Sequence, residues 1–402
     1  MKAKNMNTNK FALSLLTAAI LSAPSAFAAD PAHGKGITDA LADSKVNLLF
    51  RARYEGVDQD GIDDNANALT VKSRITVKTG SYNNLSLGLE VDNVSALVDD
   101  YNSTINGNSK YPVVADPEGT DINQAFLKYN VENFTFTGGR QRILHDNQRF
   151  VGGVGWRQNE QTYDGIRAQY NTGAFNVDYS YIHNINRIFS DKSAKGNHKG
   201  AFHLVNGNYK INKNHKVIAF AYILDYDTAL TSSSSTYGAT YNGKFGAVNV
   251  KASYASQSDN GDNPNNFTAD YLNAEVGSKF GAVTVLGGYE VLGSDNGVGF
   301  STPLATLHKF QGWTDKFLGT PGEGVQDIYL TVKGAVSGVK LAATYHDLSS
   351  DVGSKDWGSE IDLVASYKVN KNYGVLAKFA SYSADDHATD TSKLWLQLVA
   401  KF

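Results

Sequence analysis

The 402-residue chain carries 37 Lys and Arg against 40 Asp and Glu, a formal net charge of −3. A nucleic-acid-binding protein is expected to be basic, so this balance argues against that class and predicts no nucleic-acid partner. The chain has no cysteine, so an exported form could not use disulfides and must be held by its backbone ladder and its packing.

The amino terminus has the pattern of a secretory signal peptide. Three lysines among the first ten residues precede an apolar stretch over residues 11–21, and Ala26-Phe27-Ala28 forms an A-x-A cleavage site. The apolar stretch is too short to span a bilayer as a helix. We therefore predict a cleaved signal peptide over residues 1–28 and a short periplasmic segment over residues 29–45. The mean hydropathy of −0.33 agrees with the absence of a later apolar run long enough for a helical span.

From residue 46 onward the chain alternates apolar and polar residues in short runs bounded by Gly, Asn, Asp and Ser, which predicts β-strands. We expect eighteen of them, at residues 46–55, 69–79, 85–94, 121–130, 134–142, 163–171, 175–183, 201–210, 216–225, 235–242, 247–256, 270–278, 282–291, 326–334, 339–347, 359–369, 373–382 and 393–402.

The connections between these runs alternate strictly between short and long. Short connections such as Asn171-Thr172-Gly173 and Asn370-Lys371-Asn372 carry residues that tolerate the left-handed conformation of tight turns. Long connections include residues 95–120, 143–162, 184–200, 257–269, 292–325 and 383–392. An even number of strands with every second connection long is typical of outer-membrane barrels, which have short periplasmic turns and long outer loops.

The side chains of each run separate into an apolar face and a polar face. In the third run, Leu85, Leu87 and Leu89 oppose Glu90 and Asp92. A water-soluble sandwich would give the same alternation. Two features favour lipid instead: tyrosines recur at the ends of the apolar faces, where an interfacial aromatic girdle would lie, and the opposite faces are polar enough for a wet lumen. The sequence therefore predicts an all-β fold, a transmembrane antiparallel up-and-down β-barrel of about 18 strands, spanning residues 46–402 in the bacterial outer membrane.

No catalytic or metal motif emerges from the chain. The acidic run at residues 58–64 fails the EF-hand pattern, because Gly61 is fourth and Ile62 fifth. The pairs His145-Asp146 and His346-Asp347 put neighbouring side chains on opposite faces of a strand, which weakens them as catalytic dyads. We predict no enzyme activity, no cofactor and no metal site.

Two segments are too distinctive for ordinary loops. In residues 138–170 (GGRQRILHDNQRFVGGVGWRQNEQTYDGIRAQY), Arg140 and Arg142 share the parity of apolar strand residues, so a regular strand would aim both into lipid. We expect a bulge at Gly138-Gly139, or the end of the lipid belt there, to turn both inward. Residues 299–330 are unusually apolar, which predicts that this loop packs on itself or folds into the barrel mouth, with a short helix from Pro303.

These segments resemble the outer-membrane proteins of the alginate-export family, in which a GRQR strand end leads into an FVGxxxWRQNEQTYD stretch and a TPLATLHKFxGWxDKFLxTP loop follows late in the chain. The resemblance runs from about residue 45 to Phe402. It implies an eighteen-stranded monomeric barrel that carries anionic or neutral saccharide, with Arg140, Arg142 and Arg157 in its constricted region. The predicted lumen face departs from a conduit for a polyanion, which should be overwhelmingly basic. It includes Glu90, Asp92, Glu275, Glu290, Asp327, Glu360 and Asp362.

We therefore expect a porin for passive diffusion of small hydrophilic solutes, either saccharides or organic anions. Export of an acidic polysaccharide such as alginate is the alternative within the channel class, and an outer-membrane hydrolase or a surface adhesin is the alternative outside it. The expected partners are outer-membrane lipid and lipopolysaccharide, the barrel-assembly machinery, which would recognise Phe402, and the solute. The predicted pore-lining or constriction residues are Arg51, Arg53, Lys72, Arg74, Arg140, Arg142, Arg157 and Arg167.

Overall fold

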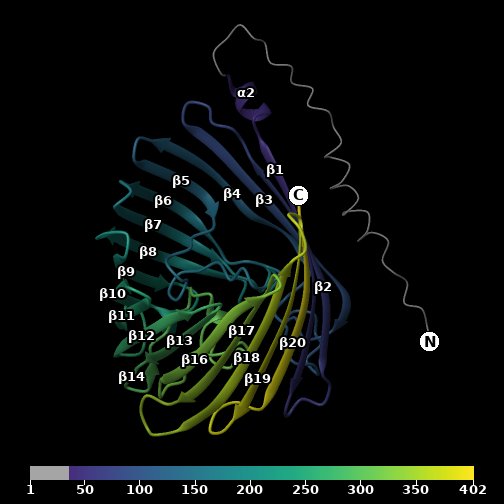
Figure 1. Cartoon of the computed structure of the whole chain (residues 1–402). Helices are drawn as coiled ribbons and strands as arrows, with labels where there is room; N and C mark the ends of the chain where they lie inside the picture. The colour runs from purple at the N-terminus through teal and green to yellow at the C-terminus, as the bar shows by residue number, and fades with distance from the viewer. Residues whose placement is uncertain (1–35) are drawn as a thin grey trace, which may run out of the picture.

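The computed structural model describes residues 36–402, so the predicted signal peptide lies outside the described residues. A short helix, α2 (Ile37–Ala42), precedes a single closed sheet of eighteen strands (Figure 1). Its strands are β1 (Lys45–Gln59), β2 (Ala66–Lys78), β3 (Leu85–Asp100), β4 (Gly119–Val131), β5 (Phe134–Gln141), β6 (Thr162–Asn171), β7 (Phe175–Asn186), β8 (Asn197–Lys210), β9 (His215–Tyr226), β10 (Ser234–Phe245), β11 (Val248–Asp259), β12 (Thr268–Phe280), β13 (Val283–Leu292), β16 (Val325–Val336), β17 (Val339–Ser349), β18 (Asp356–Lys368), β19 (Tyr373–Ala384) and β20 (Thr391–Lys401).

Each strand pairs antiparallel with its neighbours in the chain, and the last strand closes on the first. β1 runs beside β20 from Leu49 opposite Lys401 to Gln59 opposite Thr391. Beyond β20, Leu48 and Phe402 exchange two backbone hydrogen bonds of 2.9 Å. Closure leaves no strand edge unpaired, which a sheet in hydrocarbon requires. The predicted eighteen-stranded antiparallel barrel is confirmed, with each predicted strand overlapping one barrel strand in order.

The barrel has its apolar residues outside and its charged residues inside. On β3, Leu85 and Leu87 are each 45% exposed, whereas Glu90 and Asp92 are 5% and 3% exposed. A water-soluble protein would show the reverse, because exposing an apolar side chain to water costs free energy. The outer face is therefore a lipid-facing surface, and the predicted parity of this strand is confirmed. Among the described residues, no helix is both long enough and apolar enough to cross a bilayer.

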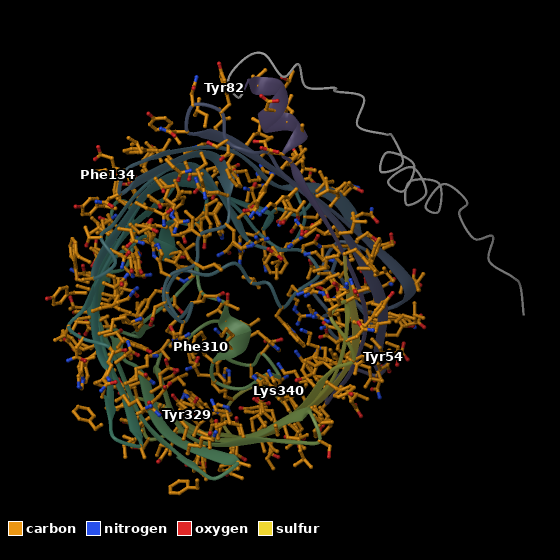
Figure 2. The ribbon with its side chains drawn as sticks, turned by 45° about the horizontal axis from the view of Figure 1, so that its top comes forward. Tyr54, Tyr82, Phe134, Phe310, Tyr329 and Lys340 are labelled. Atoms are coloured by element: carbon orange, nitrogen blue, oxygen red, sulfur yellow. The ribbon has the colours of Figure 1, made fainter. Side chains whose placement is uncertain are left out.

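Two long connections fold into the barrel instead of lying outside it. One, residues 142–161, joins β5 to β6; the other, residues 293–324, joins β13 to β16 and contains the two-residue strands β14 (Ser294–Asp295) and β15 (Val298–Gly299) and the 3₁₀ turn η2 (Leu307–Lys309). We call them the first and second inner loops. Figure 2 shows Phe310 of the second inner loop within the ring of strands. The expectation that this segment folds into the barrel is confirmed, and its helix is a single 3₁₀ turn starting four residues after Pro303.

The lumen is divided into an apolar side and a charged side. Along β7–β13, inward side chains such as Phe202 and Tyr271 form one buried cluster with Ile143 and Val151 of the first inner loop and Phe300 of the second. Aromatic contacts hold this side together; the Phe150 ring lies 4.5 Å from Phe220 and 5.2 Å from Tyr271. Glu160 and Arg157 of the first inner loop face the opposite wall, whereas Arg149 of the same loop pairs with Glu290 of β13.

Candidate constriction

The two inner loops are bonded to each other. Backbone hydrogen bonds join Gly152 N to Leu304 O at 2.8 Å and Thr306 N to Gln148 O at 3.0 Å. The hydroxyl of Thr306 also donates to the Gln148 side chain at 2.7 Å and accepts from the backbone N–H of Val154. A Cβ added at Gly152 would lie 2.3 Å from the Thr306 hydroxyl, so only glycine lets the two backbones approach this closely. The loops thus form one unit inside the barrel.

Arg51 and Arg53 attach this unit to the first strand. Arg51 donates to the carbonyl oxygen of Gly155 at 3.0 Å and to the Gln158 side chain at 2.8 Å. The Arg53 guanidinium lies 4.1 Å from the ring centroid of Trp156, a cation–π distance, and donates to Gln397 of β20 at 2.7 Å. Both arginines face the lumen, and both are engaged by protein groups.

Lys72 and Arg74 of β2 meet a carboxylate supplied by the first inner loop. Glu160 lies 3.4 Å from Lys72 and 2.8 Å from Arg74, and it also pairs with Arg142. Asp92 of β3 completes the network at 2.9 Å from Lys72 and 2.6 Å from Arg74. Burial raises the pKa of Glu160, but the charges of Lys72, Arg142 and Arg74 outweigh that effect and hold its pKa well below the usual range.

Arg142 and Arg157 lie inside, as the sequence predicts for both. Arg142 follows the end of β5, turns inward, and lies 2.8 Å from Glu90. Arg157 reaches Glu55 of β1 at 2.9 Å and Asp315 of the second inner loop at 3.1 Å. Burial lowers the pKa of Arg157, yet the surrounding carboxylates raise it above its ordinary value, so this guanidinium remains charged.

Arg140 and Arg167 do not join this network. Arg167 lies on the lumen face of β6 and is paired with Asp178 of β7. Arg140 lies on the outer face, where it binds Asp164 at 2.8 Å within a groove lined by Ile166, itself 60% exposed. The prediction that Arg140 lines the pore is therefore wrong. The ladder between β4 and β5 passes through Gly138-Gly139 without a register shift, so no bulge rotates Arg140, and its charge is neutralised by Asp164.

The sequence did not indicate a third cluster, around Lys378 of β19. Its ammonium lies 3.5 Å from the ring centroid of Trp313, 4.3 Å from Trp156 and 5.1 Å from Trp395. It also contacts His308 Nε2 at 2.7 Å. Three of the four tryptophans of the chain thus surround one cation, drawing together both inner loops and the β19–β20 wall. The sequence shows that Lys378 has lumen-facing parity and that the loops contain tryptophans. It does not show that the tryptophans contact Lys378, because that contact depends on how the loops fold back.

His308 joins this cluster to the ion pairs. Its Nδ1 lies 2.7 Å from Asp315, whose carboxylate also lies 2.9 Å from Lys393 of β20. Burial lowers the pKa of His308 to about 3, with Lys378 and Arg157 adding to the effect and Asp315 opposing it. The imidazole is therefore neutral at physiological pH and acts as a hydrogen-bonding link.

The lumen wall is consequently mixed in charge. The β2 cations Lys72 and Arg74 are matched by Glu90 and Asp92, and the inner loops add both Arg157 and Glu160. Elsewhere on the lumen wall, Glu290 of β13 binds Arg149 at 3.0 Å and Glu360 of β18 accepts from the backbone N–H of Thr314 at 2.7 Å. Such an arrangement produces an electric field across the lumen, whereas a uniformly basic wall would make the whole lumen positive.

Comparison with known proteins agrees with this architecture. Residues 46–291 match the family model described as alginate export. The chain belongs to the alginate export family. No curated protein sequence matches it.

Solved structures show the same fold at low sequence identity. The outer-membrane protein OpdK of Pseudomonas aeruginosa matches with a TM-score of 0.72 at 15% identity, over 90% of this chain and 99% of that one. OccAB4 of Acinetobacter baumannii matches with a TM-score of 0.69 at 12% identity, over 90% of this chain and 98% of that one. A structure of OpdK with vanillate matches with a TM-score of 0.71 at 14% identity, over 90% and 99% of the two chains. This alginate export family member is thus an outer-membrane β-barrel channel.

Proposed function

We propose that this channel admits small hydrophilic solutes by passive diffusion, with organic anions and saccharides as its substrates. The observation that carries the proposal is the attachment of the inner loops to the β1–β2 wall. Glu160 and Arg157 hold that attachment through buried ion pairs with Arg74 of β2, with Glu55 of β1 and with Asp315 of the second inner loop. A permeating molecule would pass beside this fixed unit, which favours a small solute over a polymer.

The charge pattern supports the same choice. Arg51, Lys72, Arg74 and Arg142 are on the lumen side, but Glu90, Asp92 and Glu160 neutralise most of their charge. We expect at most a weak preference for anions from such a wall, because ion pairing cancels most of its cationic charge. The solved structure of OpdK with vanillate, a small organic anion, makes organic anions the first solutes to test.

Export of an acidic polysaccharide is the second candidate, favoured by the family match over residues 46–291. Single-channel recording in planar bilayers separates the two. A small-solute channel conducts alone, and candidate solutes reduce its current when they occupy the lumen. A polymer conduit that depends on periplasmic partners is expected to be closed in the purified state. Well-folded protein that passes no current would contradict the proposed function.

A further inference from the structure

A pocket beside the ion-paired network lies at the outer end of the barrel, and Arg157, Asp315 and Lys393 of that network belong to its lining. It has a volume of about 350 Å³ and is enclosed by the ends of β1 and β20, by both inner loops, and by the connections that follow β3 and β7. We call it the outer pocket. Ligand pockets usually measure about 300–1,000 Å³, so its size suits one compact molecule.

Half of the residues that line the outer pocket are aliphatic. They include Val57, Ile62, Val113, Leu307 and Leu318, and Phe189 and His308 add two aromatic rings. Val113 is 49% exposed and Leu318 is 48% exposed, although both belong to connections outside the lipid-facing strands. An apolar ligand that covered these side chains would remove their apolar surface from water, and this burial favours binding.

Two cations at the outer pocket are not held in a direct ion pair with any described residue. Among residues 36–402, neither Arg187 nor Lys316 forms an ion pair, and Arg187 donates only to the backbone oxygen of Lys195, at 3.4 Å. The other charged groups of the lining are Arg157, Lys393 and Asp315, and the Asp315 carboxylate is already paired with both cations. Burial, with Lys393 adding to it and Glu360 and Asp315 opposing it, lowers the pKa of Lys316 to about 8, so an anion placed beside this ammonium would stabilise its charged form.

We propose that the outer pocket binds a compact apolar monocarboxylate, with its carboxylate at Arg187 and Lys316 and its hydrocarbon body against Val113 and Leu318. This inference rests on the proposed channel function, of which it would be the entry site. It narrows the substrate class, because sugars carry hydroxyl groups that an aliphatic wall would leave without hydrogen-bond partners. The lining supplies few amide groups to compensate; Gln59 and Gln161 are its carboxamides.

Calorimetry on the purified mature protein in detergent tests the proposal with three probes that share a six-membered ring. Cyclohexanecarboxylate has both the charge and the apolar body, cyclohexanecarboxamide lacks the charge, and glucuronate has the charge on a hydroxylated ring. We expect one saturable site for cyclohexanecarboxylate, and at least about tenfold weaker binding of each of the other two, since a charge-assisted hydrogen bond is worth about that factor.

Two variants separate the contributions of charge and apolar surface. The double change Arg187→Gln and Lys316→Gln is expected to weaken cyclohexanecarboxylate by about tenfold or more, because it removes both charge-assisted contacts. Changing Val113 and Leu318 to Asn is expected to weaken cyclohexanecarboxylate while leaving glucuronate unaffected. Lys192→Gln is the matched control, since Lys192 lies in the same connection as Arg187 but does not line the pocket. Heat-modifiable migration confirms that each variant is folded.

The proposal is overturned if cyclohexanecarboxylate shows no saturable binding, if glucuronate binds as tightly, or if the double variant binds like the parent. Conductance measured on the same preparations tests the proposed channel function independently of ligand binding to the outer pocket. A channel that conducts but does not bind cyclohexanecarboxylate contradicts the outer pocket alone. A protein that binds it and never conducts contradicts the proposed function and leaves the outer pocket standing.

Discussion

Replacing Glu160 with Gln is expected to loosen the first inner loop from the wall. Its carboxylate lies 2.8 Å from Arg74 and 3.4 Å from Lys72, also pairs with Arg142, and is only 9% exposed. Removing one partner of a buried ion pair costs about 3–5 kcal/mol. Since Asp92 and Glu90 still neutralise the three cations, we expect the lower end, about 3 kcal/mol, or roughly a hundredfold larger population of the undocked loop.

Amide hydrogen exchange over residues 142–161 measures that population, and the reversal potential in a salt gradient measures the charge left in the lumen. E160Q should exchange faster in this segment and become more anion-selective, because one negative charge is lost. Glu132→Gln, in an exposed periplasmic turn, is the matched control and should change neither. Unchanged protection together with an unshifted reversal potential would refute the assignment of Glu160 as the contact that attaches the loop.

The same carboxylate predicts how loop docking depends on pH. The folded-state pKa of Glu160 lies below its ordinary value of 4.5, so its contribution is fully present above pH 4.5 and is lost as the pH falls through the folded-state pKa. The parent loop should therefore remain protected at pH 4. In E160Q, the protection of the loop should no longer contain the pH-dependent contribution of the Glu160 carboxylate. Loss of protection in the parent between pH 6 and pH 5 would contradict this reasoning.

Three further predictions concern the seam, the second inner loop and the charged wall. Deleting Phe402 removes both of its hydrogen bonds to Leu48 and should lower the folded, heat-modifiable fraction; normal folding with only conductance altered would count against an assembly role. Deleting residues 302–321 should raise conductance in a folded variant, and an unchanged conductance would place this loop outside the permeation path. Changing Arg51, Arg53 and Arg74 to Glu should shift the reversal potential toward cation selectivity. The shift should become smaller as the salt concentration rises, because salt shortens the Debye length, which is about 8 Å at physiological salt. A parent protein that is cation-selective would contradict the anion preference.

The strands and their closure could be predicted from the sequence because they depend on local alternation. Lipid outside and water inside require opposite polarity on successive residues, and the turns require residues such as Asn83 and Asn84, both of which have positive φ. All the barrel strands except β5 extend beyond the predicted ranges at their outer ends, as β3 does to Asp100. Alternation of apolar residues weakens above the lipid belt, while the backbone ladder continues.

The candidate constriction was only partly predictable, because it depends on contacts between segments far apart in the chain. Parity placed Arg51 and Lys72 on the lumen side, but it gave no sign that Glu160 would neutralise Lys72. Arg140 was assigned inward because a charge on the lipid face is costly. Asp164 lowers that cost by pairing with it on the same face, a cross-strand contact that no local pattern shows.

Single-channel recording of the purified parent protein in a planar bilayer is the most direct test of the central claim. If the chain forms a passive channel for small solutes, it should produce stepwise currents without any periplasmic partner, show weak anion selectivity, and lose current when a small organic anion is added. Folded, membrane-inserted protein that gives no steps, or steps unaffected by any small anion or sugar, would contradict the account.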